Sequence, residues 1–105
     1  MERDRIKEIV KGVFEGQETG LKRIILFGSR ARGDFQEDSD WDILVVVDRA
    51  LSREERSLLS HLIRLAFAKM LVPVDVIIKS DMELEAYRDF PGTVTREALK
   101  EGVVL

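Results

Sequence analysis

The sequence predicts an α/β fold, a small mixed β-sheet of three or four strands flanked by helices. Helical and strand patterns alternate along the chain, which is typical of α/β domains. The chain has 105 residues, of which 45% are hydrophobic, so it can fill one core and is expected to form one domain, residues 1–105. Its apolar runs are short enough for strands.

The first half of the chain predicts helix, strand, short helix and strand. Residues 2–16 predict a helix because apolar residues recur at i, i+3, i+4 and i+7 (Ile6, Ile9, Val10 and Val13). Residues 21–27 are an apolar run that predicts a strand. Ser29 then starts a very short helix that Gly33 ends. Residues 40–47 finish as an unbroken apolar run, which predicts a strand buried on both faces.

A long helix and a third strand are expected next. Ser52 and Glu55 have the spacing of a capping box, which opens a helix over residues 53–71 that Pro73 stops. Residues 74–78 predict the third strand. The buried face of the long helix is expected to consist of Leu58, Leu59, Leu62, Ile63, Ala66, Phe67 and Met70.

The end of the chain predicts two more helices. Ser80 and Glu83 have capping-box spacing and open a short helix that Pro91-Gly92 closes. Residues 93–101 predict a last helix that ends at Gly102, and residues 103–105 are expected to pack as a terminal strand or tail.

Composition argues against several classes of protein. With 17 basic and 20 acidic residues the net charge is −3, which does not favour direct binding to nucleic acid. Cysteine is absent, so disulfides and thiolate metal sites are excluded. The charged N-terminal segment lacks the apolar run that a signal peptide has, and no apolar run approaches the roughly 20 residues that span a bilayer. A cytoplasmic protein without membrane contact is expected.

Residues 28–42 combine groups that bind phosphate with groups that bind metal. Gly28 lets the backbone approach a phosphate closely, and Ser29 adds a hydroxyl group at a helix start. Arg30 and Arg32 follow, and guanidinium groups pair well with phosphate. The first part of this segment therefore predicts a phosphate site.

Three aspartates predict a metal site beside it. Asp40 and Asp42 are two residues apart at a strand start, so their side chains point the same way from backbone positions about 7 Å apart. Such carboxylates repel unless a cation compensates them, and Mg²⁺ prefers oxygen ligands. Asp75 is the only acid of the third strand and completes a three-carboxylate, two-metal site if that strand neighbours the second.

Each motif also has a structural interpretation. Gly-Ser alone is usually a turn, Asp-x-Asp is often a strand edge or a cap, and Asp75 alone could face water from an edge strand. Four other residues that could carry a function are expected to have structural roles. His61 is expected on a helix surface or in packing, and Trp41 in the core rather than stacked on a nucleotide base. Tyr87 and Phe90 are expected to be packing residues.

The combination of these motifs resembles a known superfamily. Gly28-Ser29, ten intervening residues, Asp40-x-Asp42 and a later Asp75 resemble the nucleotidyltransferase superfamily of DNA polymerase β. The run Gly-Ser-Arg-Ala-Arg-Gly followed by Ser-Asp-x-Asp-Ile is similar to its minimal nucleotidyltransferases, which are the antitoxins of HEPN toxin–antitoxin pairs. The resemblance covers essentially the whole chain and implies a nucleotidyltransferase-like fold.

The resemblance implies a role for each residue. Gly28 and Ser29 would bind the triphosphate of ATP, with Arg30 assisting. Asp40, Asp42 and Asp75 would be the catalytic residues and the ligands of two Mg²⁺ ions, with Asp75 a possible base.

The resemblance also implies a function. The expected activity is Mg²⁺-dependent transfer of AMP from ATP to a hydroxyl group of a partner, a helical HEPN ribonuclease that is the toxin. The alternative is a non-catalytic antitoxin or nucleotide-binding module that acts by complex formation. Oligomerisation is left open.

Overall fold

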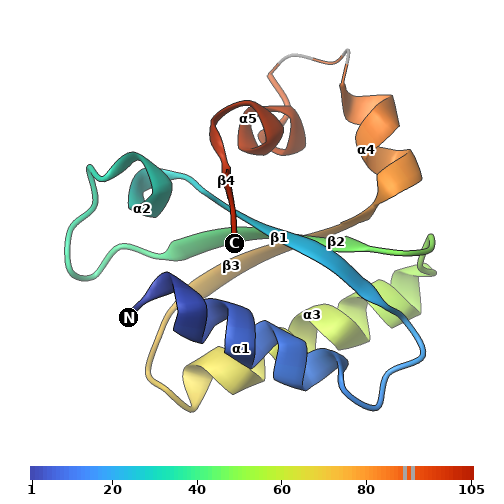
Figure 1. Cartoon of the computed structure of the whole chain (residues 1–105), viewed down its shortest axis with the longest axis horizontal. Helices are drawn as coiled ribbons and strands as arrows, with labels where there is room; N and C mark the ends of the chain where they lie inside the picture. The colour runs from blue at the N-terminus through green and yellow to red at the C-terminus, as the bar shows by residue number, and fades with distance from the viewer. Residues whose placement is uncertain (89, 91) are drawn as a thin grey trace.

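A four-stranded mixed sheet forms the centre of the computed structural model, which describes residues 1–88, 90 and 92–105 (Figure 1). The strand order is β3-β2-β1-β4. β1 pairs antiparallel with both β2 and β4, whereas β2 and β3 are parallel. The strands are β1 (Leu21–Phe27), β2 (Trp41–Val47), β3 (Val74–Ser80) and β4 (Val103–Val104). The predicted α/β class with a mixed sheet is confirmed.

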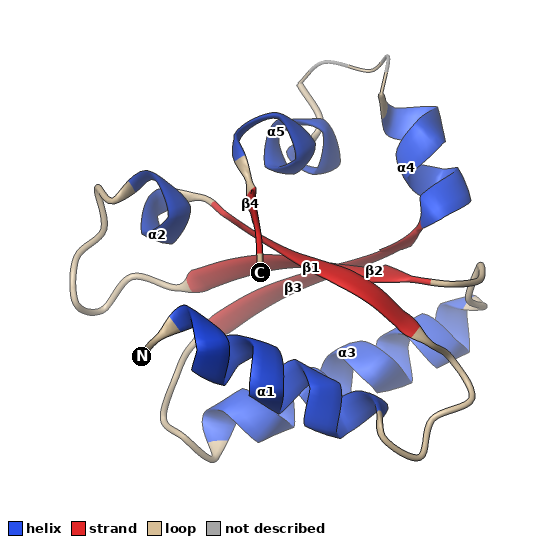
Figure 2. Ribbon diagram, viewed as in Figure 1, coloured by secondary structure: helices blue, strands red, loops and turns tan. Residues whose placement is uncertain are grey.

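Helices cover both faces of the sheet (Figure 2). α1 and α3 lie against one face, and α4 and α5 lie on the other. α2 is a single turn between β1 and the loop that leads into β2. The helices are α1 (Arg3–Phe14), α2 (Ser29–Arg32), α3 (Arg53–Ala68), α4 (Asp81–Tyr87) and α5 (Val94–Glu101). No helix in the described ranges is long and apolar enough to cross a bilayer.

Alternation along β2 builds two hydrophobic cores. Trp41, Ile43 and Val45 face α1 and α3, whereas Leu44 and Val46 face α4 and α5. All five side chains are buried, so the predictions of a strand buried on both faces and of a core tryptophan are confirmed. Alternate residues of a strand point to the same face. Asp42 therefore lies on the face of Leu44 and Val46, the side of α4 and α5.

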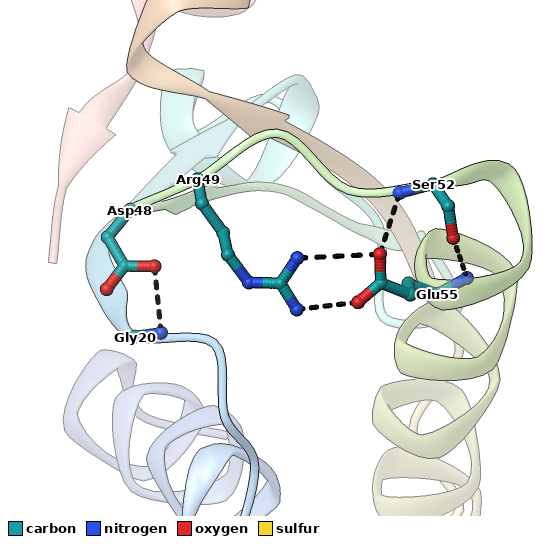
Figure 3. A network of polar contacts seen from close by, with 5 residues as sticks. All are labelled: Gly20, Asp48, Arg49, Ser52 and Glu55. Atoms are coloured by element: carbon teal, nitrogen blue, oxygen red, sulfur yellow. Dashed lines mark hydrogen bonds and ion pairs between the residues drawn. The ribbon is translucent and has the colours of Figure 1, made fainter.

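The start of α3 is fixed by the predicted capping box. The Ser52 Oγ accepts from the Glu55 backbone N–H at 3.1 Å, and the Glu55 carboxylate accepts from the Ser52 N–H at 3.0 Å (Figure 3). Arg49 donates to the same carboxylate at 2.6 Å, and Asp48 accepts from the Gly20 N–H at 3.0 Å. The network ties the end of β2 to both the β1 start and the α3 start.

The end of α3 differs from the prediction. The helix ends at Ala68 rather than at residue 71, so Pro73 does not stop it. Leu71 has φ 58, its N–H donates to the Ala68 carbonyl, and the Val72 N–H donates to the Phe67 carbonyl. This is the hydrogen-bond pattern of a Schellman motif, which closes the helix before the proline.

Some expected helix faces and ends are also corrected. Leu58 is 57% exposed, because the buried face of α3 is narrower than the apolar pattern and is centred on Leu59, Ile63 and Phe67. Met70 is 43% exposed and lies beyond the end of α3. Phe90 is 62% exposed and lies after α4, so it is not a packing residue.

Other expected ends differ by a few residues. α4 ends at Tyr87, and Pro91, part of its expected closure, lies outside the described residues. α1 spans two residues fewer at its C-terminal end than expected, and α5 ends before Gly102 as predicted.

Candidate functional site

Asp42 and Asp75 lie side by side across the parallel strands β2 and β3. They are register partners, so their side chains leave the same face of the sheet at its N-terminal edge. Asp40 lies two residues before Asp42, immediately before β2. Asp40 and Asp75 are exposed, whereas Asp42 is half-buried. The three predicted carboxylates therefore come from one edge of the sheet, with Asp42 the most enclosed.

The electrostatics of Asp42 show that these charges repel one another. Its pKa is raised above the ordinary value, first by burial of the carboxyl group, then by the charges of Asp75 and Asp40. The positive charge of Arg32 acts in the opposite direction and lowers the pKa. The edge thus holds an excess of negative charge that a bound cation would relieve.

Gly28 brings the β1–α2 turn directly against Asp42. Its φ is 74, a conformation that L-residues with a side chain adopt at a cost. A Cβ built on Gly28 would collide with the Asp42 Oδ2 and would lie 3.0 Å from its Cγ. Only glycine therefore allows the backbone of this turn to approach the carboxylate so closely.

Ser29 begins α2 next to that contact. It is half-buried, and its carbonyl accepts from the Gly33 N–H at 2.9 Å, which closes the single helical turn. Gly33 has φ 88 and ends the turn as predicted. The backbone of residues 28 and 29 is thus held beside the carboxylates by a short, closed structure.

Arg30 is held by the loop that carries Asp40. Its guanidinium lies 4.3 Å from the centroid of the Phe35 ring and 4.6 Å from that of Trp41, within the range of cation–π attraction. It also donates to the carbonyls of Glu37 and Ser39, each at 3.0 Å. These are the contacts of a loop anchor, and a nucleotide contact by Arg30 stays a prediction.

Arg32 has a closer relation to the carboxylates than Arg30. It is near enough to lower the pKa of Asp42, and it donates to Glu101 of α5 at 3.1 Å and to Asp34 at 3.2 Å. Sequence reasoning noted Arg32 without placing it among the site residues. A signal was present, since positions three apart lie on one side of a helix and Arg32 is three residues after Ser29.

The donor set fits magnesium in an open site. In the part of the chain that the structure describes, no three acidic, histidine or cysteine side chains are close enough to hold a metal ion by themselves. Mg²⁺ is commonly bound by one or two carboxylates, with water and substrate phosphate completing its shell. Carboxylate oxygens from Asp42, Asp75 and Asp40, next to the close approach of the Gly28 turn to Asp42, suit that mode of binding.

Sequence comparison identifies the chain's relatives. The family model for the nucleotidyltransferase domain matches residues 3–105. A Methanocaldococcus jannaschii protein named "Putative protein adenylyltransferase MJ0604" is 36% identical over 106 residues, covering 99% of this chain and 97% of that protein. "Putative protein adenylyltransferase MJ0141" of the same organism is 43% identical over 51 residues, covering 49% of this chain and 52% of that protein.

Solved structures share the fold. A crystal structure described as a "putative nucleotidyltransferase from Sulfolobus solfataricus" has a TM-score of 0.62 at 29% identity, covering 95% of this chain and 76% of that one. A structure described as a "toxin-antitoxin with AMP-PNP" has a TM-score of 0.61 at 23% identity, covering 93% and 70%. At that identity the second likeness concerns the fold alone. By the match over residues 3–105 and the full-length relative, the chain belongs to the nucleotidyltransferase domain family and is a nucleotidyltransferase.

Proposed function

We propose that this nucleotidyltransferase is a Mg²⁺-dependent protein adenylyltransferase that transfers AMP from ATP to a hydroxyl group of a partner protein. The observation that carries the proposal is the pairing of Asp42 with Asp75 directly beside Gly28. A triphosphate bound at the turn would lie next to the carboxylates. The name of the full-length relative, a protein adenylyltransferase, supports a protein as acceptor.

The proposed partner is the toxin of a toxin–antitoxin pair. Structures with this fold are described as toxin–antitoxin complexes, among them "MntA-HepT". We infer that the chain acts as the antitoxin and that its acceptor is a helical HEPN-domain ribonuclease. The net charge of −3 agrees with a protein acceptor, because nucleic acid is usually bound by basic surfaces.

Each site residue has a proposed task. Gly28 and Ser29 bind the triphosphate, and Arg32 adds positive charge from the same short helix. Asp40, Asp42 and Asp75 would hold Mg²⁺, which supplies charge neutralisation for the phosphoryl group when it is bound. Arg30 keeps Asp40 in place through its contacts with the preceding Ser39 carbonyl.

The reaction is a displacement at the α-phosphorus of ATP. The acceptor hydroxyl oxygen forms a bond to that phosphorus, and the bond from it to the oxygen bridging the β-phosphorus breaks, so pyrophosphate leaves. The hydroxyl proton passes to the Asp75 carboxylate, which is exposed and can receive a group from outside. The chain orients the phosphate and the acceptor, which is the main task in phosphoryl transfer.

Transfer of label from ATP tests this proposal. The chain and its co-purified partner are incubated with Mg²⁺ and ATP labelled at either the α- or the γ-phosphate. Only the α-label is expected to appear on the partner, and Asp42→Asn should abolish transfer. Asp38→Asn, an exposed acid of the same loop, should leave it unchanged. Labelling by γ-labelled ATP, or full transfer by Asp42→Asn, would reject the proposal.

The alternative function is neutralisation of the partner by binding alone, without AMP transfer. The Asp40→Asn/Asp42→Asn variant separates the two functions when partner activity is assayed in the complex. Loss of neutralisation with retained binding supports transfer, and full neutralisation supports binding alone.

A further inference from the structure

The outer edge of β3 is the long free edge of the sheet. The strand order β3-β2-β1-β4 leaves β3 and β4 at the edges. β3 has seven residues and β4 has two. In the described chain no strand pairs with β3 on the side away from β2. An edge of this length carries backbone N–H and C=O groups that can pair with another strand.

A groove runs along this edge. It has a volume of about 350 Å³ and is lined by the four consecutive residues 76–79 of β3, and by Arg53, Arg56, Ser57 and Ser60 of α3. Consecutive strand residues point to opposite faces. A groove that contacts four consecutive residues therefore runs along the backbone edge of the strand and not over one of its faces. The edge is therefore accessible to a partner rather than covered by α3.

The sequence of β3 is complementary to itself in one antiparallel register. When the two-fold axis passes through Ile77, Asp75 lies opposite Lys79 of the second copy, and Val76 lies opposite its Ile78. Both charged pairs then have opposite signs, and all three central pairs are apolar. Opposed charges and β-branched residues are favourable cross-strand pairs.

The neighbouring registers are worse. Directly opposed residues of two strands point to the same face of the sheet. The two-fold axis must therefore lie where one residue stands opposite its own copy. The registers next to Ile77 are those centred on Val76 and on Ile78. The first choice places Asp75 opposite Ile77 and Pro73 opposite Lys79. The second places Lys79 opposite Ile77 and leaves Asp75 opposite the start of α4, beyond β3, so neither charge has an opposite partner. One register is thus selected by the charges of the strand.

Asp75 and Lys79 are available for this pairing. Asp75 is exposed and forms no ion pair within the described ranges. Lys79 contacts Tyr87, with 3.4 Å between its Nζ and the hydroxyl oxygen and 4.8 Å between the Nζ and the ring centroid. That is a contact with a neutral group, so a carboxylate from a second copy would be a stronger partner for the ammonium group.

We propose that two copies of the chain associate through antiparallel pairing of their β3 edges, in the register centred on Ile77, to form a continuous eight-stranded sheet. The occupant of the groove edge is a second copy because the strand supplies both signs of charge at matching positions. The proposal goes beyond the proposed function. It gives Asp75 a contact with Lys79 of the second copy in addition to its proposed place at the metal site. The dimer is measured without nucleotide or partner, so its failure is distinct from a failure of AMP transfer.

Charge reversal at two positions tests the dimer. The mass in solution is measured by light scattering and sedimentation over a roughly hundredfold range of protein concentration, because dimerisation follows mass action. The wild-type chain is expected to be dimeric at the upper end of the range. Lys79→Asp and Asp75→Lys each place like charges opposite each other and should shift the chain to monomer. The double variant Asp75→Lys/Lys79→Asp restores opposite charges and should restore the dimer.

A charge reversal away from β3 is the control for this experiment. Lys100→Asp makes the same change of charge at an exposed position of α5 and should leave the dimer intact. Circular dichroism checks that each variant folds. If Lys79→Asp does not fold, Asp75→Lys still tests the proposal, because Asp75 is exposed. A monomeric wild-type chain at every concentration overturns the proposal, as does a dimer that ignores both single reversals or a double variant that stays monomeric.

Discussion

Gly28 is the residue at which backbone conformation and site chemistry meet. Its positive φ and its contact with the Asp42 carboxylate impose separate requirements, and glycine satisfies both. Gly33 has a similar φ of 88, but a Cβ there would meet nothing within 4 Å. A substitution at Gly33 therefore tests backbone strain alone, whereas one at Gly28 combines strain with a collision against Asp42.

Gly28→Ala is expected to damage the site more than the fold. Gly33→Ala should lose roughly 1–2 kcal/mol of stability through left-handed strain. Gly28→Ala should lose more, because φ 74 with ψ −160 is a conformation essentially restricted to glycine. Only Gly28→Ala displaces Asp42, and a displacement of about 1 Å can lower a rate roughly hundredfold. Chemical denaturation and AMP-transfer rates are compared for both variants. Equal losses of activity in the two would contradict a specific role for the Gly28 contact.

Arg30 is expected to position the loop before Asp40. Arg30→Ala removes both stacking contacts and the hydrogen bonds to Ser39, so kcat should fall with little change in the KM for ATP. Trp41 is the single tryptophan, and loss of the guanidinium should shift its fluorescence emission to the red.

A lysine at the same position provides the matched comparison. Arg30→Lys retains a cation for the two rings but lacks the planar fork that reaches the carbonyls, so an intermediate kcat is expected. A rise in KM alone, with unchanged emission, would instead support direct contact of Arg30 with the nucleotide.

At this scale the sequence predicted relations that depend on local geometry. Two aspartates at i and i+2 share a face when both lie in a strand. Asp42 lies in β2 and Asp40 immediately before it, so the shared orientation of the pair stays a prediction. The contacts of Arg30 and Arg32 could not be predicted from spacing, because they depend on which side of a single helical turn meets the sheet. That orientation is set by Trp41 and by Glu101 of α5, which contact the turn although they are separated from it in the sequence.

The two ends of α3 show how far side chains determine where a helix begins and ends. Its start follows from Ser52 and Glu55, whose reciprocal hydrogen bonds were predicted from sequence and are present. Its end is a Schellman motif with leucine at the left-handed position. Glycine usually occupies that position, so its absence concealed the true end and made Pro73 the more visible signal.

Replacing Leu71 by glycine is expected to stabilise the protein. Leu71 is 91% exposed, so little packing is lost, while the strain of its positive φ is relieved. The gain is about 1 kcal/mol, reduced by the greater freedom of glycine in the unfolded chain. Thermal and urea unfolding measure it, and Leu71→Ala, which keeps the strain, is the comparison. A loss of stability in Leu71→Gly would show that the side chain contributes more than its exposure indicates.

Glu55 gives the α3 start a dependence on pH. Hydrogen bonds from Arg49, then from the Ser52 backbone, lower the pKa of its carboxyl group from 4.5 to about 2 (Figure 3). Because the folded-state pKa lies below the unfolded value, the carboxylate stabilises the fold above pH 4.5, and this contribution is lost as the pH falls from 4.5 toward 2.

A melting series in pH tests this contribution. At neutral pH, Glu55→Gln should melt below the wild-type chain, since glutamine keeps an acceptor for the Ser52 N–H but loses the charge that holds Arg49. The difference in Tm should narrow as the pH falls below 4.5. A difference independent of pH would assign the effect to hydrogen-bond geometry rather than charge.

The whole molecule depends on a sheet packed on both faces. Phe67 is fully buried among residues of α1, α3 and the sheet, whereas Leu58 on the same helix is 57% exposed. The apolar pattern of α3 placed both on the buried face. The sequence could not separate them, because the width of a buried face is decided by the neighbouring helix and sheet.

Phe67→Ala and Leu58→Ala should therefore differ sharply. The first is expected to cost about 3–5 kcal/mol, a large part of the roughly 5–15 kcal/mol that stabilises a typical protein. The second should lie within about 0.5 kcal/mol of the wild-type chain. Urea unfolding of both variants measures the difference. A large loss in Leu58→Ala would mean that its exposed surface is covered in solution.

Element order predicted the class of fold but only part of the topology. The alternation of helices and strands implied a sheet flanked by helices, and the long helix between the second and third strands is a crossover that allows their parallel pairing. The position of β4 beside β1 depends on α5 returning across the sheet, and a two-residue strand has too little pattern to predict. The adjacency of β2 and β3 was needed for the candidate site and could be stated only as a condition.

The alternating sides of β2 limit how relatives of this chain can change in length. Inserting one amino acid between Asp42 and Val46 would reverse the face of the side chains on one side of the insertion relative to the other. Either Asp42 or the apolar residues after it would then point to the wrong face. Inserting one between Gly33 and Asp40, before the strand begins, leaves these faces unchanged. Gains and losses of residues during evolution should therefore accumulate in that connection and be nearly absent from the strand after it.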